Sequence, residues 1–262
     1  MTTARVSVLG PVHKTTFFDT VHFEWIKMRT VRASLWSLVS AAALMLGIGL
    51  IGAKQVKAGV DPAIVLNDVM SGVLFGQVAM CAFGAMAATG EYATGTIGTT
   101  FTAVPGRTRL LCAKALAVWA VATVAGVLSS LAAFFTGVAA LPAGIAHPSI
   151  TSGTVLRAVV GLGIYLGILA VFALALGLVV RAAAGAITAA ITITVVAPIV
   201  FLTTGTVGRH LDEWWPTEAG RQILDIGPAH GTLPPLAGLA YFTAITLAAC
   251  TAATSLVNRR DA

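Results

Sequence analysis

Six stretches, each about as long as the roughly 20 apolar residues a helix needs to cross a bilayer, alternate with short charged segments along this sequence. Charged residues make up 10% of the chain and hydrophobic residues 57%, whereas a soluble domain carries roughly 25% charged residues. A soluble fold of this composition would expose large apolar patches. We therefore predict an all-α integral membrane protein and exclude a soluble enzyme, a nucleic-acid-binding domain and a disordered linker. The predicted spans are residues 33–53, 69–90, 115–140, 158–180, 182–204 and 236–257.

The basic residues indicate how these spans are oriented. Six spans place both termini on one side of the membrane, and cytoplasmic segments are enriched in Lys and Arg. Eleven of the 16 basic residues fall on the side of the termini. They are Arg5, Lys14, Lys27, Arg29, Arg32, Arg107, Arg109, Lys114, Arg181, Arg259 and Arg260. We therefore predict a multi-pass protein of the cytoplasmic membrane with both termini in the cytoplasm and no nucleic-acid partner.

The segments outside the spans are few. Residues 1–16 are predicted to be a flexible arm, and residues 17–262 a single transmembrane domain. Residues 17–32 read as an amphipathic helix lying in the cytoplasmic interface. Its apolar face is predicted to hold Phe18, Val21, Trp25 and Met28, with Glu24, Lys27 and Arg29 away from that face. The longest external connection, 205–235, is predicted to contain a short helix that starts at Pro216.

The chain lacks the motifs of an ATPase, a hydrolase or a metal site. It has no GxxxxGK[ST] phosphate loop, no HExxH or GxSxG motif and no Cys/His cluster with ligand spacing. The interiors of the predicted spans hold no Asp, Glu, Lys, Arg or His, although ion-coupled transporters usually place an ionisable group at membrane depth. We therefore expect no enzyme activity and no bound cofactor or metal, and we expect a partner to supply the energy for any transport.

The segment between the second and third spans, residues 91–114, has a distinctive pattern. It reads Glu91, then the triplet Gly95-Thr96-Ile97, then Phe101, Pro105, Arg107, Arg109 and Lys114. This order of a Glu, a Gly-Thr-hydrophobic triplet, a hydrophobic residue, a Pro and re-entrant basic residues resembles the first cytoplasmic loop of the ABC-2-type transporter permeases. The stretch 23–38, an amphipathic helix that runs into the first span, is similar to the family's entry. The resemblance covers essentially the whole chain.

This resemblance implies the membrane subunit of an ABC exporter. Such a subunit forms a homodimer or heterodimer of permeases and docks two copies of a separate ATPase, which bind ATP and Mg. The loop would then be the element that couples to the ATPase. Its implied contact residues are Glu91, Tyr92, Thr94, Gly95, Thr96, Ile97, Thr100, Phe101, Pro105, Arg107 and Arg109. A solvated loop whose basic residues only set the topology is the simpler alternative.

Few polar side chains lie within the spans. Gln77 lies in the second span and Thr188 and Thr192 share a face of the fifth, and in the resembling transporters these two spans line the central path. A path without charges favours lipophilic or amphipathic cargo, because it offers nothing to offset the desolvation of an ion. Pro198 is predicted to free a backbone carbonyl and to kink the fifth span.

Two other functions remain open at this point. One is an ion-coupled transporter that works without an ATPase. The other is a non-transporting membrane scaffold or immunity protein that only binds a partner.

Overall fold

The computed structural model describes residues 16–57, 59–95, 106–226 and 233–260, and these residues form helices and connecting loops with no strand among them. Within these described residues, six helical segments are long and apolar enough to cross a membrane, which confirms the prediction of an all-α, multi-pass membrane protein. They are α2 (Arg32–Gln55), α4 (Val73–Ala93), α6 (Arg107–Ala139), α7 (Gly153–Val180), the fifth span formed by α8 (Ala183–Ile191), η1 (Thr192–Val196) and α9 (Ala197–Thr203), and α12 (Pro235–Arg260).

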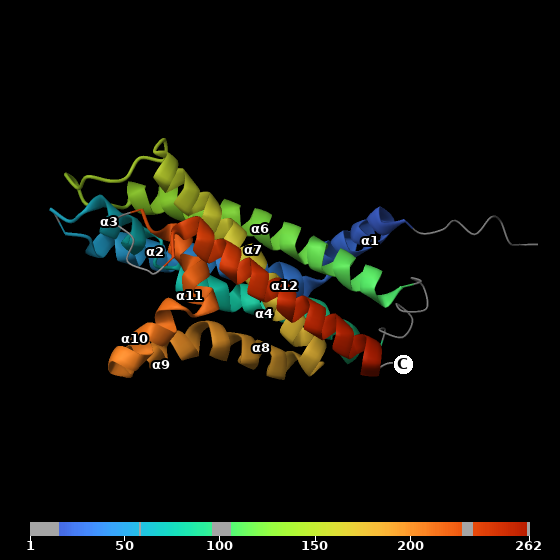
Figure 1. Ribbon diagram of the computed structural model, residues 1–262. Helices are drawn as coiled ribbons and strands as arrows, with labels where there is room; N and C mark the ends of the chain where they lie inside the picture. The colour runs from blue at the N-terminus through green and yellow to red at the C-terminus, as the bar shows by residue number, and fades with distance from the viewer. Residues whose placement is uncertain (1–15, 58, 96–105, 227–232, 261–262) are drawn as a thin grey trace, which may run out of the picture.

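Short helices lie at the two ends of this bundle (Figure 1). At one end lie α1 (Phe17–Thr30) and the C-terminal end of α12, and we call this the terminal end. At the opposite end lie α3 (Pro62–Val69), α10 (Gly205–Glu213), α11 (Pro216–Arg221) and η2 (Gln222–Leu224).

Two of the helix boundaries that differ from the predicted spans have local causes. The second span was predicted to start at residue 69, but the chain turns between Val69 and Val73, so α3 and α4 are separate helices. Asp61 caps α3, because its Oδ1 accepts a hydrogen bond from the N–H of Ala63 at 2.7 Å. The third span was predicted to start at 115, but α6 begins at Arg107, directly after Gly106 with φ 112°. The helix therefore starts about two turns earlier than its apolar stretch.

The centre of the bundle is α7, which packs against α4, α6 and α12. Over the most apolar 18 residues of α7 the mean hydropathy is 2.6, and 83% of that stretch is buried. A helix that is apolar on all sides belongs in the interior of a bundle rather than at its edge. Small residues allow the close approach, since a Cβ at Gly84 would lie 1.9 Å from the carbonyl oxygen of Ala170.

The first helix packs with a face that differs from the predicted one. Thr20, Glu24 and Met28 are its buried residues, whereas the side chain of Phe18 is 78% exposed. The prediction that Phe18 and Met28 share the apolar face, with Glu24 away from it, is therefore wrong. The cause is the ion pair between Glu24 and Lys114, which periodicity does not reveal. Through this pair α1 packs on α6, and Phe18 and Phe23 remain exposed.

A π-helical turn, η1, interrupts the fifth span directly before α9. Pro198 has no N–H and follows Ile193 by five residues, so it cannot bond to the Ile193 carbonyl in the π-helical pattern. The indole Nε1 of Trp215 donates to that carbonyl at 2.7 Å instead. A backbone acceptor inside a lipid-embedded helix is thus satisfied by a side chain from the connection that follows the span.

Candidate functional site

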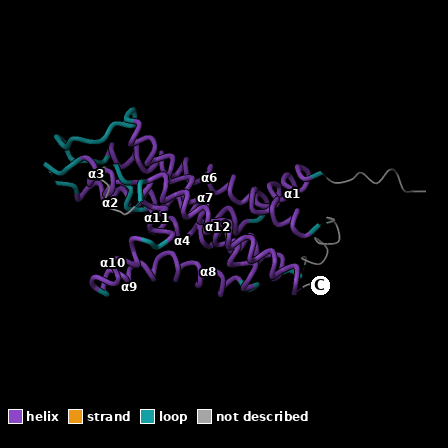
Figure 2. Tube along the Cα trace, viewed as in Figure 1, coloured by secondary structure: helices purple, strands orange, loops and turns teal. Residues whose placement is uncertain are grey.

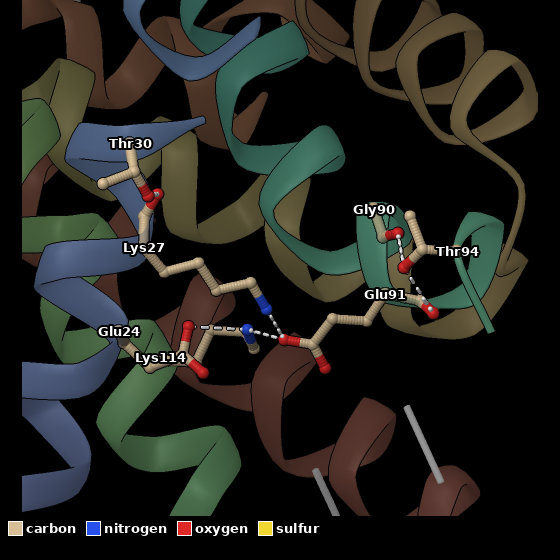
Figure 3. Close-up of polar contacts among 7 residues, drawn as sticks. All are labelled: Glu24, Lys27, Thr30, Gly90, Glu91, Thr94 and Lys114. Atoms are coloured by element: carbon tan, nitrogen blue, oxygen red, sulfur yellow. Dashed lines mark hydrogen bonds and ion pairs between the residues drawn. The ribbon is translucent and has the colours of Figure 1, made fainter. Parts of the chain in front are cut away.

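Four charged side chains meet inside the terminal end of the bundle, between α1, α4 and α6 (Figure 3). The Nζ of Lys114 lies 2.7 Å from Glu24 Oε2 and 2.6 Å from Glu91 Oε1. Lys27 also donates to Glu91 Oε1. Glu24, Glu91 and Lys114 are each at most 3% exposed, so these ion pairs are largely withdrawn from solvent. We call these four residues the charge cluster.

The position of each charged residue along its helix explains why these side chains meet. Glu24 follows Thr20 by four residues and precedes Met28 by four, so the three lie on one face of α1. Glu91 lies in the last turn of α4, and Lys114 lies about two turns inside α6. The three helices therefore deliver two carboxylates and two ammonium groups to one point, and their formal charges cancel.

Burial makes the charge cluster sensitive to the loss of any member. Removing one partner of a buried ion pair costs about 3–5 kcal/mol, because the remaining charge stays desolvated and uncompensated. Only an arrangement that keeps all four charges paired avoids this cost. We therefore expect the cluster to favour the arrangement of α1, α4 and α6 seen here.

The residue after Glu91 connects α4 to a different part of the bundle. The guanidinium carbon of Arg181 lies 5.3 Å from the centre of the Tyr92 ring, within cation–π range. Arg181 has φ 61°, the left-handed conformation that ends α7 just before α8 begins. Two consecutive residues at the end of α4 thus contact α1 and α6 on one side and the α7–α8 corner on the other.

A cavity of about 220 Å³ adjoins the charge cluster. Lys27 and Thr94 line it together with Met28 of α1 and Val118 of α6. The hydroxyl of Thr94 donates to the carbonyl of Gly90 at 2.9 Å, so it closes the end of α4. Gly95 follows with φ 69°, a conformation that favours glycine.

The described residues include part of the predicted coupling segment. Glu91, Tyr92, Thr94 and Gly95 end α4, and Arg107 and Arg109 begin α6. The remaining predicted contact residues, Thr96, Ile97, Thr100, Phe101 and Pro105, lie outside the described residues.

Sequence reasoning missed that Glu24 and Lys114 pair with each other and with Glu91. The sequence does contain a signal for this pairing. Few charged residues flank these helices, and Glu24 lies between Thr20 and Met28 on one face of its helix. When that face packs, its carboxylate needs a cation as a partner.

A second polar group lies among the spans, where α4, α7 and η1 meet. The hydroxyl of Tyr165 donates to Gln77 Oε1 at 3.0 Å, and Gln77 Nε2 donates to the carbonyl of Thr194 at 3.4 Å. The Sγ of Cys81 lies 3.6 Å from Thr194 Oγ1. Pro198 explains the carbonyl, since it offers no N–H to Thr194 four residues earlier.

The predicted cargo-path residues are only partly brought together. Gln77 is 1% exposed and belongs to this buried polar group. Thr188 and Thr192 share a face as predicted, but that face is exposed rather than turned toward Gln77. Thr194 provides the inward hydroxyl instead.

The opposite end of the bundle holds a cavity of about 500 Å³ between the α3–α4 corner and the α10–η2 region. Asp212, Glu213, Glu218, Arg221 and Asp225 line it. Burial raises the pKa of Glu218, although its ion-pair partner Arg221 counteracts part of this effect. Burial also raises the pKa of Asp212, with Arg221 opposing the rise and Glu213 adding to it. For Arg221, burial lowers the pKa, but Glu218, Tyr165 and Asp212 together outweigh burial, so the pKa is raised overall.

No group of three or more His, Cys, Asp or Glu suited to a metal ion occurs among the described residues. Comparison of the sequence with protein-family models and with curated proteins gives no match. The geometry of this chain is therefore the basis for any function assigned to it.

Proposed function

We propose that this chain is the membrane-spanning permease subunit of an ABC exporter, of the ABC-2 type. It would move a lipophilic or amphipathic substrate across the cytoplasmic membrane with ATP hydrolysed by a separate ATPase subunit. Two permeases, identical or different, would dock two ATPases at the terminal end, which would then face the cytoplasm.

One observation carries this proposal. The end of α4, from which the segment 96–105 leaves, is tied by Glu91 to α1 and α6 and by Tyr92 to the α7–α8 corner. A loop that only joins two spans needs no such contacts at the helix end from which it starts. A loop that receives a force from an ATPase needs one, because the force has to reach several spans at once.

The charge cluster supports a transmission role for α1. If an ATPase displaces residues 96–105, Glu91 moves with the end of α4, and Lys27 and Lys114 follow its carboxylate. Breaking these pairs inside the bundle is costly, so moving the three helices together is favoured over separating them. The ATPase must bind one arrangement of this end more tightly than the other, and a shift from 1:99 to 99:1 needs about 5.5 kcal/mol of differential binding.

The polar group around Gln77 supports an uncharged cargo. Tyr165, Gln77 and Thr194 satisfy one another with neutral hydrogen bonds, and Cys81 lies beside them. Such a group offers no counter-charge to an ion, whose desolvation would be expensive.

The test is to purify the tagged chain in mild detergent from its native membrane and to identify its companions by mass spectrometry. We expect a stoichiometric ATPase with a phosphate loop, and ATP-dependent cargo movement when the complex is reconstituted in liposomes. The test variant combines Gly95→Pro with Arg107→Glu. The matched control combines Gly144→Pro with Arg209→Glu, since Gly144 also has positive φ in the connection between α6 and α7, and Arg209 lies in α10.

We expect the test variant to insert normally and to lose the ATPase, while the control variant keeps it. Normal transport by the test variant would overturn the coupling role. A clean oligomer without an ATPase would overturn the ABC assignment. Ion-driven flux in liposomes would then indicate a coupled transporter, and its absence a scaffold or immunity protein.

A further inference from the structure

A long groove lies on the outer side of α7, between α6 and α12. Ile168 and Val171 of α7 line it together with Leu116 and Trp119 of α6 and Leu247 of α12. Its volume is about 650 Å³, within the range of roughly 300–1,000 Å³ that is typical of small-molecule sites. The side chains of Trp119 and Leu247 are 40% and 60% exposed, so the groove opens toward the lipid.

The groove follows the bundle from the terminal end to the middle of the membrane. At the terminal end Asn258 Nδ2 donates to Thr108 Oγ1 at 3.4 Å, which joins α12 to α6. From Asn258 the groove reaches Thr243, which at 1.5 Å per residue is roughly 22 Å along α12. No Asp, Glu, Lys, Arg or His is among its described lining residues, so the groove suits an uncharged and largely apolar ligand.

Hydroxyl groups on α12 line the groove, and one of them stands apart. Thr243, Thr251, Thr254 and Ser255 each donate to a carbonyl of their own helix, at 2.8 Å in every case. Thr246 is 3% exposed, and its Oγ1 has no hydrogen-bond partner among the described residues. A buried hydroxyl without a partner is costly, and more so at membrane depth, where water is absent.

We infer that this groove binds a neutral lipophilic molecule with a single hydrogen-bonding group, such as a carbonyl or hydroxyl. Because Thr246 Oγ1 is covered in this structure although the residue lines the groove, the pairing of that group with Thr246 requires the Thr246 side chain to turn to another staggered rotamer that brings its hydroxyl into the groove. An acyl chain of a resident lipid fills the apolar walls but leaves Thr246 unpaired. Because Thr246 lies near the middle of α12, the polar group of the ligand has to lie within its apolar body rather than at a headgroup. That this ligand is the exported cargo rests on the proposed function, whereas the binding itself does not.

Photolabelling of the purified chain, reconstituted alone in phosphatidylcholine nanodiscs, tests the inference. The probes are a long-chain dialkyl ketone that carries a diazirine and the alkane of matched length with the same diazirine. We expect the ketone to label peptides from residues 107–119 and 243–258 several-fold more than the alkane. Thr246→Val should reduce ketone labelling by about three- to tenfold, the effect of one hydrogen bond, and leave alkane labelling unchanged.

Two further variants serve as controls for the labelling experiment. Thr243→Val removes a hydroxyl from the same groove that already bonds to Leu239, so it should leave labelling by both probes unchanged. Thr251→Trp fills the groove from an exposed position and should suppress both probes without disturbing the core. Equal labelling by ketone and alkane would overturn the inference, and so would a Thr243→Val effect as large as that of Thr246→Val.

Native cysteines distinguish a small ligand from a second copy of the chain. Cys112 and Cys250 both line the groove, whereas Cys81 is fully buried elsewhere. Efficient crosslinking of Cys112 and Cys250 between copies would show that the groove is a protein interface and would overturn the inference. Selective ketone labelling without any associated ATPase would keep the ligand site and remove its cargo role, so the two proposals fail separately.

Discussion

Lys114 Nζ lies 2.7 Å from Glu24 Oε2, although 90 residues separate the two positions. Because both side chains are buried, this contact makes α1 a part of the bundle rather than an anchor that lies beside it. The same ammonium group also contacts Glu91. One lysine therefore connects the first helix, the end of the second span and the start of the third.

Replacing this lysine tests the structural weight of the charge cluster. Lys114→Met leaves Glu24 without a cation and Glu91 with Lys27 alone. We expect a loss of about 3–5 kcal/mol in the free energy of unfolding, because a buried carboxylate becomes unpaired. Denaturant unfolding in detergent, followed by tryptophan fluorescence, measures this change.

A double variant separates the loss of a charge from the loss of a side chain. Glu24→Gln combined with Lys114→Met leaves the Lys27–Glu91 pair balanced. We expect it to be clearly more stable than Lys114→Met alone, since residues within one ion-pair network do not act additively. If the double variant is as unstable as the sum of the two single variants, the pairing energy assigned to the cluster is wrong.

The crossing of α4 and α7 provides a test of close helix packing. Gly84→Ala would place its Cβ 1.9 Å from the carbonyl of Ala170, so the helices have to separate. Overpacking of this kind costs about 1–3 kcal/mol. Gly90→Ala on the same helix is the control, because no atom lies within 4 Å of its added Cβ. Gly90→Ala should be neutral or slightly stabilising in the same unfolding measurement.

The sequence predicts the number and approximate position of the spans because this information is local. Each span needs only enough consecutive apolar residues. The turn between Val69 and Val73 is the largest departure of the second span from its predicted course. The Trp215-Pro216 junction likewise indicates where a helix starts, since α11 begins at Pro216.

The packed faces of the helices could not be predicted in the same way. In lipid, an apolar residue can face either the membrane or the bundle, so periodicity does not decide between Phe18 and Met28. The partner of Glu24 lies on α6, far away in sequence, and the inward hydroxyl of the fifth span is that of Thr194, which shares a face with the buried Ala186 and Ala190. These outcomes depend on contacts between helices.

The hydrogen bond between Trp215 and the π-helical turn can be tested by substitution. Trp215→Phe keeps the contact with the Phe201 ring, 5.0 Å away, but removes the donor to the Ile193 carbonyl. We expect a loss of about 1–3 kcal/mol, because the acceptor stays buried and unpaired. Trp214→Phe is the control, since the Trp214 side chain is 52% exposed.

Pro198→Ala checks the cause of that loss. An alanine restores an N–H beside the freed carbonyls, so Trp215→Phe should cost less in the Pro198→Ala background than in the original chain. An equal cost in both backgrounds would show that the indole acts through packing and not through the hydrogen bond. The double-mutant cycle is measured by thermal unfolding in detergent.

The acidic cavity at the opposite end predicts how stability depends on pH. Burial raises the pKa of Asp212 and of Glu218, so the folded chain binds protons more tightly there than the unfolded chain. Stability from these two groups is therefore fully present below the ordinary carboxyl pKa of about 4 and falls as the pH rises through the raised values. Asp212→Asn should flatten this decline in unfolding midpoints measured upward from about pH 4. Gln222→Met, which lines the same cavity without an ionisable group, should keep the slope of the original chain. A slope that is unchanged by Asp212→Asn, or one that rises with pH in this range, would contradict the prediction.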